Sequence, residues 1–147
     1  MKQPTSVRVR YAETDQMGFA HHANYLVWFE AARTDFFRQT GKTYAEFEAE
    51  GVMIPLTDAE CHYHAPAYYD ELLEVDCRLA RLTPTRLELS YAVRRDGRLL
   101  AEGRTAHAFL DAARRRPVNL AKRAPELWAL LQRLALAEHP EREERRR

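Results

Sequence analysis

The residues with the clearest capacity for chemistry lie close together near the beginning of the chain. Asp15 precedes a turn glycine, Gly18, and the adjacent histidines His21 and His22, and a strongly apolar helical pattern begins at Asn24. The first N–H groups of a helix lack intrahelical acceptors and carry a partial positive charge. Such a group can polarise a carbonyl oxygen while a nearby carboxylate acts on the carbon. The order of these residues therefore predicts a site that acts on a carbonyl group.

Residues 11–30 resemble the signature of the hotdog-fold acyl-CoA thioesterases of the 4-hydroxybenzoyl-CoA thioesterase class. In that family the pattern reads roughly Tyr-x-x-Thr/Cys-Asp-x-x-Gly-x-x-x-His/Pro-x-Asn-Tyr and is followed by an aromatic-rich helix. This chain matches it almost throughout, and the resemblance continues more loosely to about residue 120. The resemblance implies hydrolysis of an acyl-CoA thioester to a free acid and CoA, with no cofactor.

The resemblance also gives roles to individual residues. Asp15 falls on the family's catalytic aspartate, which acts in its ionised form as a nucleophile or as the general base for a water molecule. His22 falls where the backbone N–H binds the thioester oxygen, and its imidazole could also orient Asp15 or a water. Asn24 is expected to cap the helix or tie the loop down, and Tyr25 to line the acyl pocket or pack against the sheet. Without the resemblance, Asp15 and Gly18 would be interpreted as an ordinary turn.

Three further charged residues are weaker candidates. Glu30 lies on the apolar helix, where another hotdog branch places a catalytic glutamate, but Asp15 already supplies the acid. Arg81 and Arg86 flank a turn that, by the resemblance, contacts the CoA phosphates. The alternative is that they are ordinary solvated charges at strand ends. Tyr69 departs from the family pattern, which commonly has glycine there, so the shape of that turn stays open.

Other kinds of site have little support in the sequence. The histidines at positions 21, 22, 62 and 64 lack the Asp, Glu or Cys spacing that would complete a recognised metal site. The chain contains neither the Gly-x-Ser-x-Gly sequence of serine hydrolases nor a glycine-rich phosphate loop. Cys61 and Cys77 lie in apolar alternating runs, which favours buried thiols over a disulfide or a nucleophile. We therefore expect no metal and no cofactor.

Composition indicates a globular protein with no preference for polyanions. The chain of 147 residues is 46% hydrophobic and 31% charged, with a net charge of +1. No overall field would attract nucleic acid or an acidic membrane. Residues 1–140 are expected to form one domain, followed by a charged tail over 141–147. Because no apolar run reaches the ~18 residues of a membrane span and the N-terminal residues lack a signal-peptide core, we expect a cytoplasmic protein.

Hydrophobic periodicity divides the domain into strands and helices. Alternation of apolar and polar residues predicts strands over 6–11, 53–63, 73–79, 87–93 and 98–110. Asp96-Gly97 predicts a tight hairpin between the last two. Helical spacing predicts a long helix over 24–40, ended by Gly41, and a terminal helix over 124–137. A short helix is expected to start at Thr43, with Glu46 completing a capping box.

This order of elements predicts an α+β fold of the hotdog type. A five-stranded antiparallel sheet would wrap around the long central helix, which is apolar on nearly its whole circumference. The sheet keeps unpaired edge strands, which invite a second copy of the chain. With the resemblance, this predicts a homodimer or homotetramer in which the acyl tunnel is shared between subunits.

Two other functions remain open at this point. A hydratase or dehydratase acting on enoyl or 3-hydroxyacyl thioesters uses the same fold, but it needs a histidine base in a different motif. A non-catalytic acyl-CoA-binding module is the third possibility, and the intact Asp15 argues against it. The size of the acyl group depends on the packing of Trp28, Phe29, Phe36 and Tyr63, which the sequence does not determine.

Overall fold

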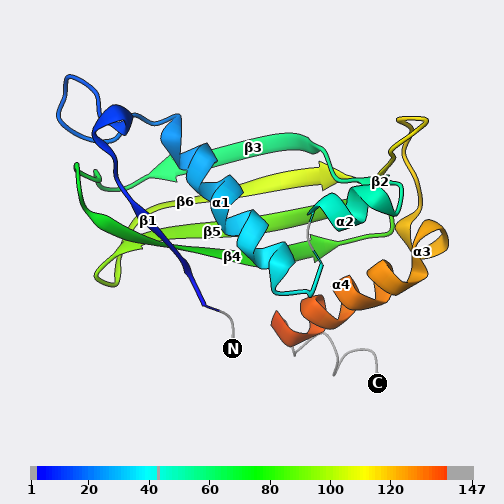
Figure 1. Ribbon diagram of the computed structural model, residues 1–147. Helices are drawn as coiled ribbons and strands as arrows, with labels where there is room; N and C mark the ends of the chain where they lie inside the picture. The colour runs from blue at the N-terminus through cyan, green and yellow to red at the C-terminus, as the bar shows by residue number, and fades with distance from the viewer. Residues whose placement is uncertain (1–2, 43, 139–147) are drawn as a thin grey trace.

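The computed structural model describes residues 3–42 and 44–138. Five antiparallel strands form one sheet in the order β1-β4-β5-β6-β3, and helix α1 (Asn24–Arg38) crosses one face of it (Figure 1). The strands are β1 (Thr5–Arg8), β3 (Leu56–Tyr63), β4 (Leu72–Leu82), β5 (Arg86–Arg95) and β6 (Arg98–Ala108). The predicted α+β fold, with an antiparallel sheet and a long central helix, is confirmed.

Helix α1 packs on the sheet through Phe29, which meets Tyr91 of β5. The two rings are stacked, with centroids 4.4 Å apart and an interplanar angle of 10°. Gly103 of β6 makes this contact possible, because a Cβ atom there would lie 2.4 Å from the Phe29 ring and 2.5 Å from the Glu60 carbonyl oxygen. Any larger residue at 103 would push the helix away from the sheet or break the β3–β6 pairing.

Within a single chain the sheet packs against one side of α1. Tyr25, Trp28 and Phe29 are buried against the strands, whereas Leu26 and Val27 are 43% and 54% exposed. The sheet curves too little to enclose the helix (Figure 1). An apolar strip of α1 therefore faces outwards.

Several predicted strands end earlier than the alternation of residues suggested. The first strand ends at Arg8, because residues 11–13 turn into the short 3-10 helix η1 (Tyr11–Glu13). The strand predicted over 53–63 is divided near Pro55 into β2 (Val52–Met53) and β3. The strand predicted over 98–110 is divided at Phe109, whose N–H donates to the Thr85 carbonyl instead of continuing the ladder. The small β7 (Leu110–Asp111) that follows pairs with β2.

The remaining helices close one end of the sheet. Helix α2 (Tyr44–Ala49) follows Gly41, and α3 (Leu120–Arg123), which was not expected, precedes α4 (Pro125–Glu138). Leu127 and Leu131 of α4 are buried, and the helix packs beside β4. The predicted cap at Thr43 and the charged tail over 141–147 lie outside the described residues. In the described part of the chain, no helix is long and apolar enough to cross a membrane.

A directed chain of hydrogen bonds lies inside the fold, between α1 and the sheet. Arg33 donates to the Tyr91 hydroxyl (3.1 Å), Tyr91 lies 2.6 Å from the Thr105 hydroxyl, and Thr105 lies 2.8 Å from Nε2 of His107. Nδ1 of His107 is 3.3 Å from the Ile54 carbonyl oxygen. A neutral His107 that donates from Nδ1 and accepts at Nε2 satisfies every member of the chain. Burial, together with nearby Arg33, lowers the pKa of His107 to about 4.

Acidification is expected to destabilise the protein through His107. As the pH falls, the unfolded chain takes up this proton near pH 6.5, whereas the native state takes it up only near pH 4. The contribution of neutral His107 to the free energy of unfolding is fully present above pH 6.5. It is lost as the pH falls from 6.5 to 4, and this lowers the free energy of unfolding by on the order of 3 kcal/mol. Urea unfolding between pH 4 and 7.5 should show this fall in the wild type and a flatter profile in His107→Gln. The same pH dependence in both proteins would contradict the prediction.

Candidate active site

The segment 14–20 forms a tight loop that presents Asp15. Gly18 donates to the Asp15 carbonyl (3.0 Å), Asp15 donates to the Phe19 carbonyl (3.1 Å), and Gly18 has a φ of +86°, which favours glycine. The Asp15 carboxylate accepts one hydrogen bond, at Oδ1 from the Met17 N–H (2.9 Å). Its second oxygen has no hydrogen-bond partner among the described residues. The loop therefore orients the carboxylate through one oxygen and leaves the other available.

The backbone N–H of His22, directly before α1, is available in the same way. The N–H of His21 donates to the Glu13 carbonyl (2.8 Å), that of Ala23 to Nδ1 of His21 (3.2 Å), and that of Asn24 to the His21 carbonyl (3.0 Å). The His22 N–H has no acceptor within the described chain. A donor of this kind, next to the start of a 15-residue helix, can bind a developing negative charge on oxygen.

Asn24 ties the loop down and does not cap the helix. Its side-chain amide donates to the carbonyls of Glu13 (2.9 Å) and His21 (3.1 Å), whereas the N-cap position is occupied by Ala23. The His21 carbonyl and the His22 N–H belong to one planar peptide group. Asn24 therefore fixes the direction of the His22 N–H. Its hydrogen bond also withdraws electron density from the His21 carbonyl, which makes the His22 N–H a stronger donor.

Glu13 connects the loop to the helix, although no motif in the sequence indicated it. Its carboxylate, only 4% exposed, accepts from the Arg10 backbone N–H (2.7 Å) and from the Trp28 indole N–H (3.0 Å). Its backbone carbonyl accepts from His21 and Asn24. The buried indole of Trp28 needed an acceptor, and this was the signal that could have indicated a nearby acid.

Asp15 and His22 border the same cavity, which has a volume of about 270 Å³. The residues that line it are Asp15, Met17, Phe19, Ala20, His22, Tyr25, Tyr63, His64, Ala65 and Pro66. Tyr25 is buried and forms an edge contact with Tyr63, with centroids 4.9 Å apart. The Tyr63 hydroxyl donates to the His22 carbonyl (3.0 Å), and desolvation raises the pKa of Tyr63 to about 12. One hollow is thus lined by an ionisable acid, by the residue that carries the available backbone donor and by two aromatic rings.

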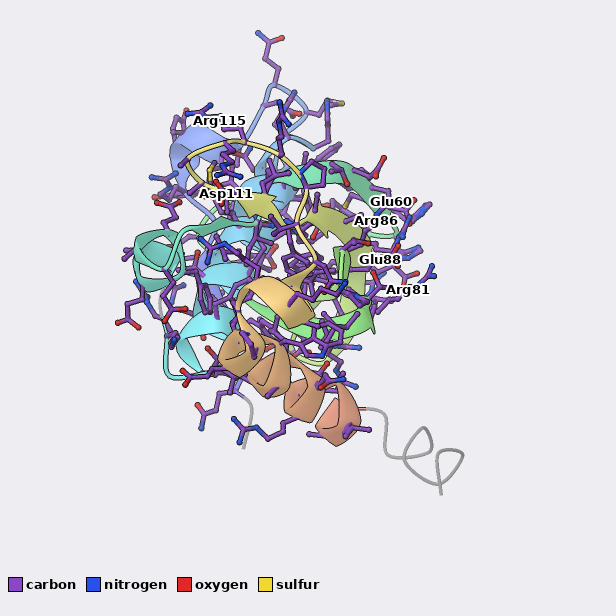
Figure 2. All side chains as sticks on the ribbon, turned by 90° about the vertical axis from the view of Figure 1, so that its right-hand side faces the viewer. Glu60, Arg81, Arg86, Glu88, Asp111 and Arg115 are labelled. Atoms are coloured by element: carbon purple, nitrogen blue, oxygen red, sulfur yellow. The ribbon has the colours of Figure 1, made fainter. Side chains whose placement is uncertain are left out.

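The other predicted residues lie elsewhere. Glu30 lines a separate groove of about 210 Å³ between α1 and β3, together with Arg33. Arg81 and Arg86 lie where β4 and β5 meet, beside Glu88 in Figure 2. Strand pairing places Arg86 opposite Ala108, whereas the cavity lies at the other end of the sheet, where Tyr63 pairs with Ala101. Within one chain, the two arginines are therefore remote from Asp15.

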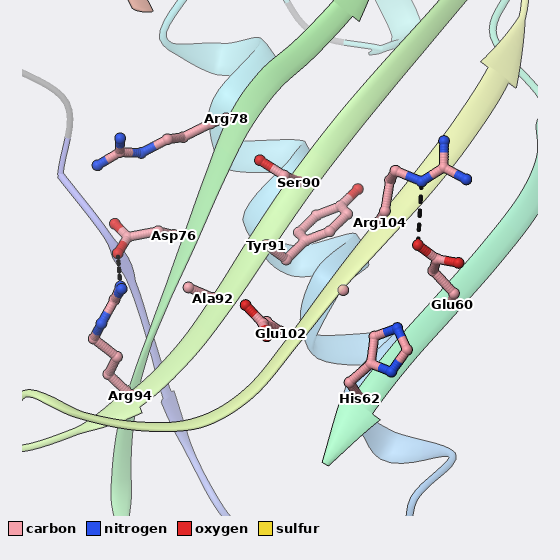
Figure 3. Close-up of a pocket in the computed structure, with 11 residues that line it drawn as sticks. Glu60, His62, Asp76, Arg78, Ser90, Tyr91, Ala92, Arg94, Glu102 and Arg104 are labelled. Atoms are coloured by element: carbon pink, nitrogen blue, oxygen red, sulfur yellow. Dashed lines mark hydrogen bonds and ion pairs between the residues drawn. The ribbon is translucent and has the colours of Figure 1, made fainter. Parts of the chain in front are cut away.

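A larger hollow, of about 450 Å³, lies on the face of the sheet that points away from α1 (Figure 3). Its charged rim is largely paired, with Arg94 bound to Asp76 (2.9 Å) and Arg104 bound to Glu60 (3.3 Å). Among the described residues, no group of three or more His, Cys, Asp or Glu side chains could hold a metal ion.

Comparison with known proteins places this geometry in a family. The model of the thioesterase-like superfamily matches residues 9–131. The chain belongs to this superfamily. Among curated proteins, the acyl-CoA thioester hydrolase YbgC of Escherichia coli is 30% identical over 79% of this chain and 87% of its own length.

Solved structures agree with this assignment. The protein TT1821 of Thermus thermophilus is 40% identical, with a TM-score of 0.80 over 92% of this chain and 98% of its own. The DHNA-CoA thioesterase of Staphylococcus aureus is 29% identical, with a TM-score of 0.87 over 94% of both chains. The predicted hotdog fold of the thioesterases is therefore confirmed.

Removal of the Glu13 carboxylate should destabilise this thioesterase-like protein. Glu13→Ala leaves the buried Trp28 indole without its acceptor, which is expected to lower the free energy of unfolding by about 1–3 kcal/mol. Glu13→Gln keeps an acceptor oxygen and should cost less. Urea unfolding measures both, with Glu48→Ala on the exposed face of α2 as the matched control. If the free energy of unfolding fell no more in Glu13→Ala than in Glu48→Ala, the hydrogen bond between Glu13 and Trp28 would contribute little to stability.

Proposed function

We propose that this protein hydrolyses an acyl-CoA thioester to a free acid and CoA. The observation that carries the proposal is that Asp15 and His22 line one cavity, and that the His22 N–H has no acceptor among the described residues. Membership of the thioesterase-like superfamily and the similarity to a named acyl-CoA thioester hydrolase support the same reaction.

The two groups have complementary roles in this mechanism. The thioester oxygen accepts a hydrogen bond from the His22 N–H, which stabilises the negative charge that develops as the carbonyl carbon is attacked. Asp15 either attacks that carbon itself, releasing the CoA thiolate and forming an anhydride that water then cleaves, or removes a proton from an attacking water. Asn24 and Tyr63 act on the peptide groups on either side of His22, so they position the donor and do not react.

Asp15→Asn should abolish turnover and leave the fold intact. The substitution preserves size but removes the charge required by both routes, so kcat should fall by a factor on the order of 10² or more. Release of CoA thiol from a panel of acyl-CoA substrates measures this loss. Asp96→Asn, the same chemical change in the β5–β6 turn, is the matched control and should keep wild-type activity. If Asp15→Asn remained active, Glu30→Gln would be the next variant to test.

Two copies of the chain would complete the substrate site. Strand β3 is an edge of the sheet, and its Leu56 is exposed, as are Leu26 and Val27 of α1 across the groove beside it. Pairing β3 with its counterpart across a two-fold axis is antiparallel, so the Leu56 end of one copy lies beside the Tyr63 end of the other. This brings Arg86, which is bound to Asp58 of β3 (3.5 Å), towards the partner's cavity. We therefore propose a homodimer, or a homotetramer made of two such dimers, in which these arginines contact the CoA phosphates across the interface.

Subunit mixing tests whether the site is shared. Asp15→Asn and Arg86→Glu should each lower activity on their own, the second by raising KM for the CoA ester. When the two variants are unfolded and refolded together, half of the dimers are mixed and each of these contains one intact site, so about a quarter of wild-type activity should return. No recovery, or light scattering that shows a fully active monomer, would rule out the shared site.

A further inference from the structure

Two hollows lie along the face of β3 that is directed towards α1, and Tyr63 lines the first of them. On β3, Ala59, Cys61 and Tyr63 follow a two-residue period, so they share the face of the strand that is directed towards the helix. Tyr63 lines the cavity that contains Asp15 and His22, whereas Ala59 lines the groove that contains Val27 and Glu30. On this face only Cys61 lies between them, over a distance of roughly 13 Å along the strand.

Within one chain, the Tyr63 ring is held at both ends although β3 is an edge strand. Its hydroxyl donates to the His22 carbonyl (3.0 Å), and its ring meets Tyr25 at an interplanar angle of 90°. Tyr63 is 49% exposed within one chain, so in that chain its position depends on these contacts and on its interaction with the Cys61 side chain more than on close packing. A ring held in this way forms a wall at the end of the cavity nearest the second groove.

We propose that Tyr63 determines acyl-chain specificity by closing this cavity, so that the enzyme takes short aliphatic or single-ring acyl groups. The inference rests on the proposed thioesterase function. The cavity, at about 270 Å³, is smaller than the ~300–1,000 Å³ of pockets that hold drug-sized ligands. A long acyl chain would have to continue past Cys61 into the groove beside Ala59, and the Tyr63 ring occupies that route.

The ring and the hydroxyl of Tyr63 have separable effects. The ring closes the cavity and thereby selects the acyl group. The hydroxyl bonds the carbonyl of the residue whose N–H polarises the thioester, so it positions that residue. Loss of the hydroxyl alone should lower kcat for every substrate with little change in KM, and should leave the preference for chain length as it is.

The test is a chain-length profile of kcat/KM, from acetyl-CoA and benzoyl-CoA to palmitoyl-CoA, followed by thiol release. Tyr63→Val keeps a strand-forming residue and removes the ring, so the ratio of long-chain to short-chain kcat/KM should rise by ~10-fold or more. Tyr63→Phe should keep the wild-type ratio. Tyr68→Val, at an exposed tyrosine outside the cavity, is the matched control.

A second substitution makes the result independent of general damage to the fold. Ala59→Phe added to Tyr63→Val should fill the neighbouring groove and restore the preference for short chains. The proposal is overturned if the wild type already hydrolyses long chains as well as short ones, or if Tyr63→Val leaves the ratio unchanged. A wild type without thioesterase activity would overturn the proposed function, and this inference with it.

Discussion

The close contact between α1 and the sheet at Gly103 is the constraint on which the rest of the molecule depends. With no side chain at 103, the Phe29 ring lies flat on Tyr91 against the strands. This contact fixes the depth at which α1 lies, and helices in a packed interior do not slide continuously. Because His22 comes two residues before the first turn of α1, the depth of the helix also fixes where its backbone N–H lies.

The hydrogen bonds of Glu13 connect the loop that carries Asp15 to helix α1. Glu13 contacts α1 through the Trp28 indole and contacts the segment before the helix through its own carbonyl. Asp15 follows Glu13 by two residues, and the segment that contains the His22 N–H is bonded to the Glu13 carbonyl. The positions of the carboxylate and of the backbone donor therefore both depend on the buried Glu13. The position of the His22 N–H therefore does not depend on the exposed tip of the loop, whereas the Asp15 carboxylate is also oriented by the Met17 N–H at that tip.

The sequence predicted those features that depend on local pattern. The extent of α1 followed from apolar spacing, and the hairpin at Asp96-Gly97 followed from residues that tolerate positive φ, here +48° and +81°. Of the residues named from the motif, Asp15, His22 and Tyr25 line one cavity, and Gly18 shapes the loop beside it.

Features that depend on contacts remote in the sequence were missed. Leu26 and Val27 are as apolar as their buried neighbours, so composition alone could not reveal that the sheet leaves them uncovered. Glu13 finds Trp28 across 15 positions, and Arg86 lies at the far end of the sheet because of strand register, not because of its own identity. The break at Pro55 depended on the pairing of β2 with β7, which no short window of residues encodes.

The environment of the two thiols has a practical consequence for work with this enzyme. Cys77 is buried, and burial raises the pKa of the half-buried Cys61, which lies beside Tyr63. Since the thiolate is the reactive form, both side chains should react slowly with disulfide reagents and oxidants. The protein itself should thus give a low background in chromogenic assays that titrate liberated CoA, and it should tolerate storage without a reductant.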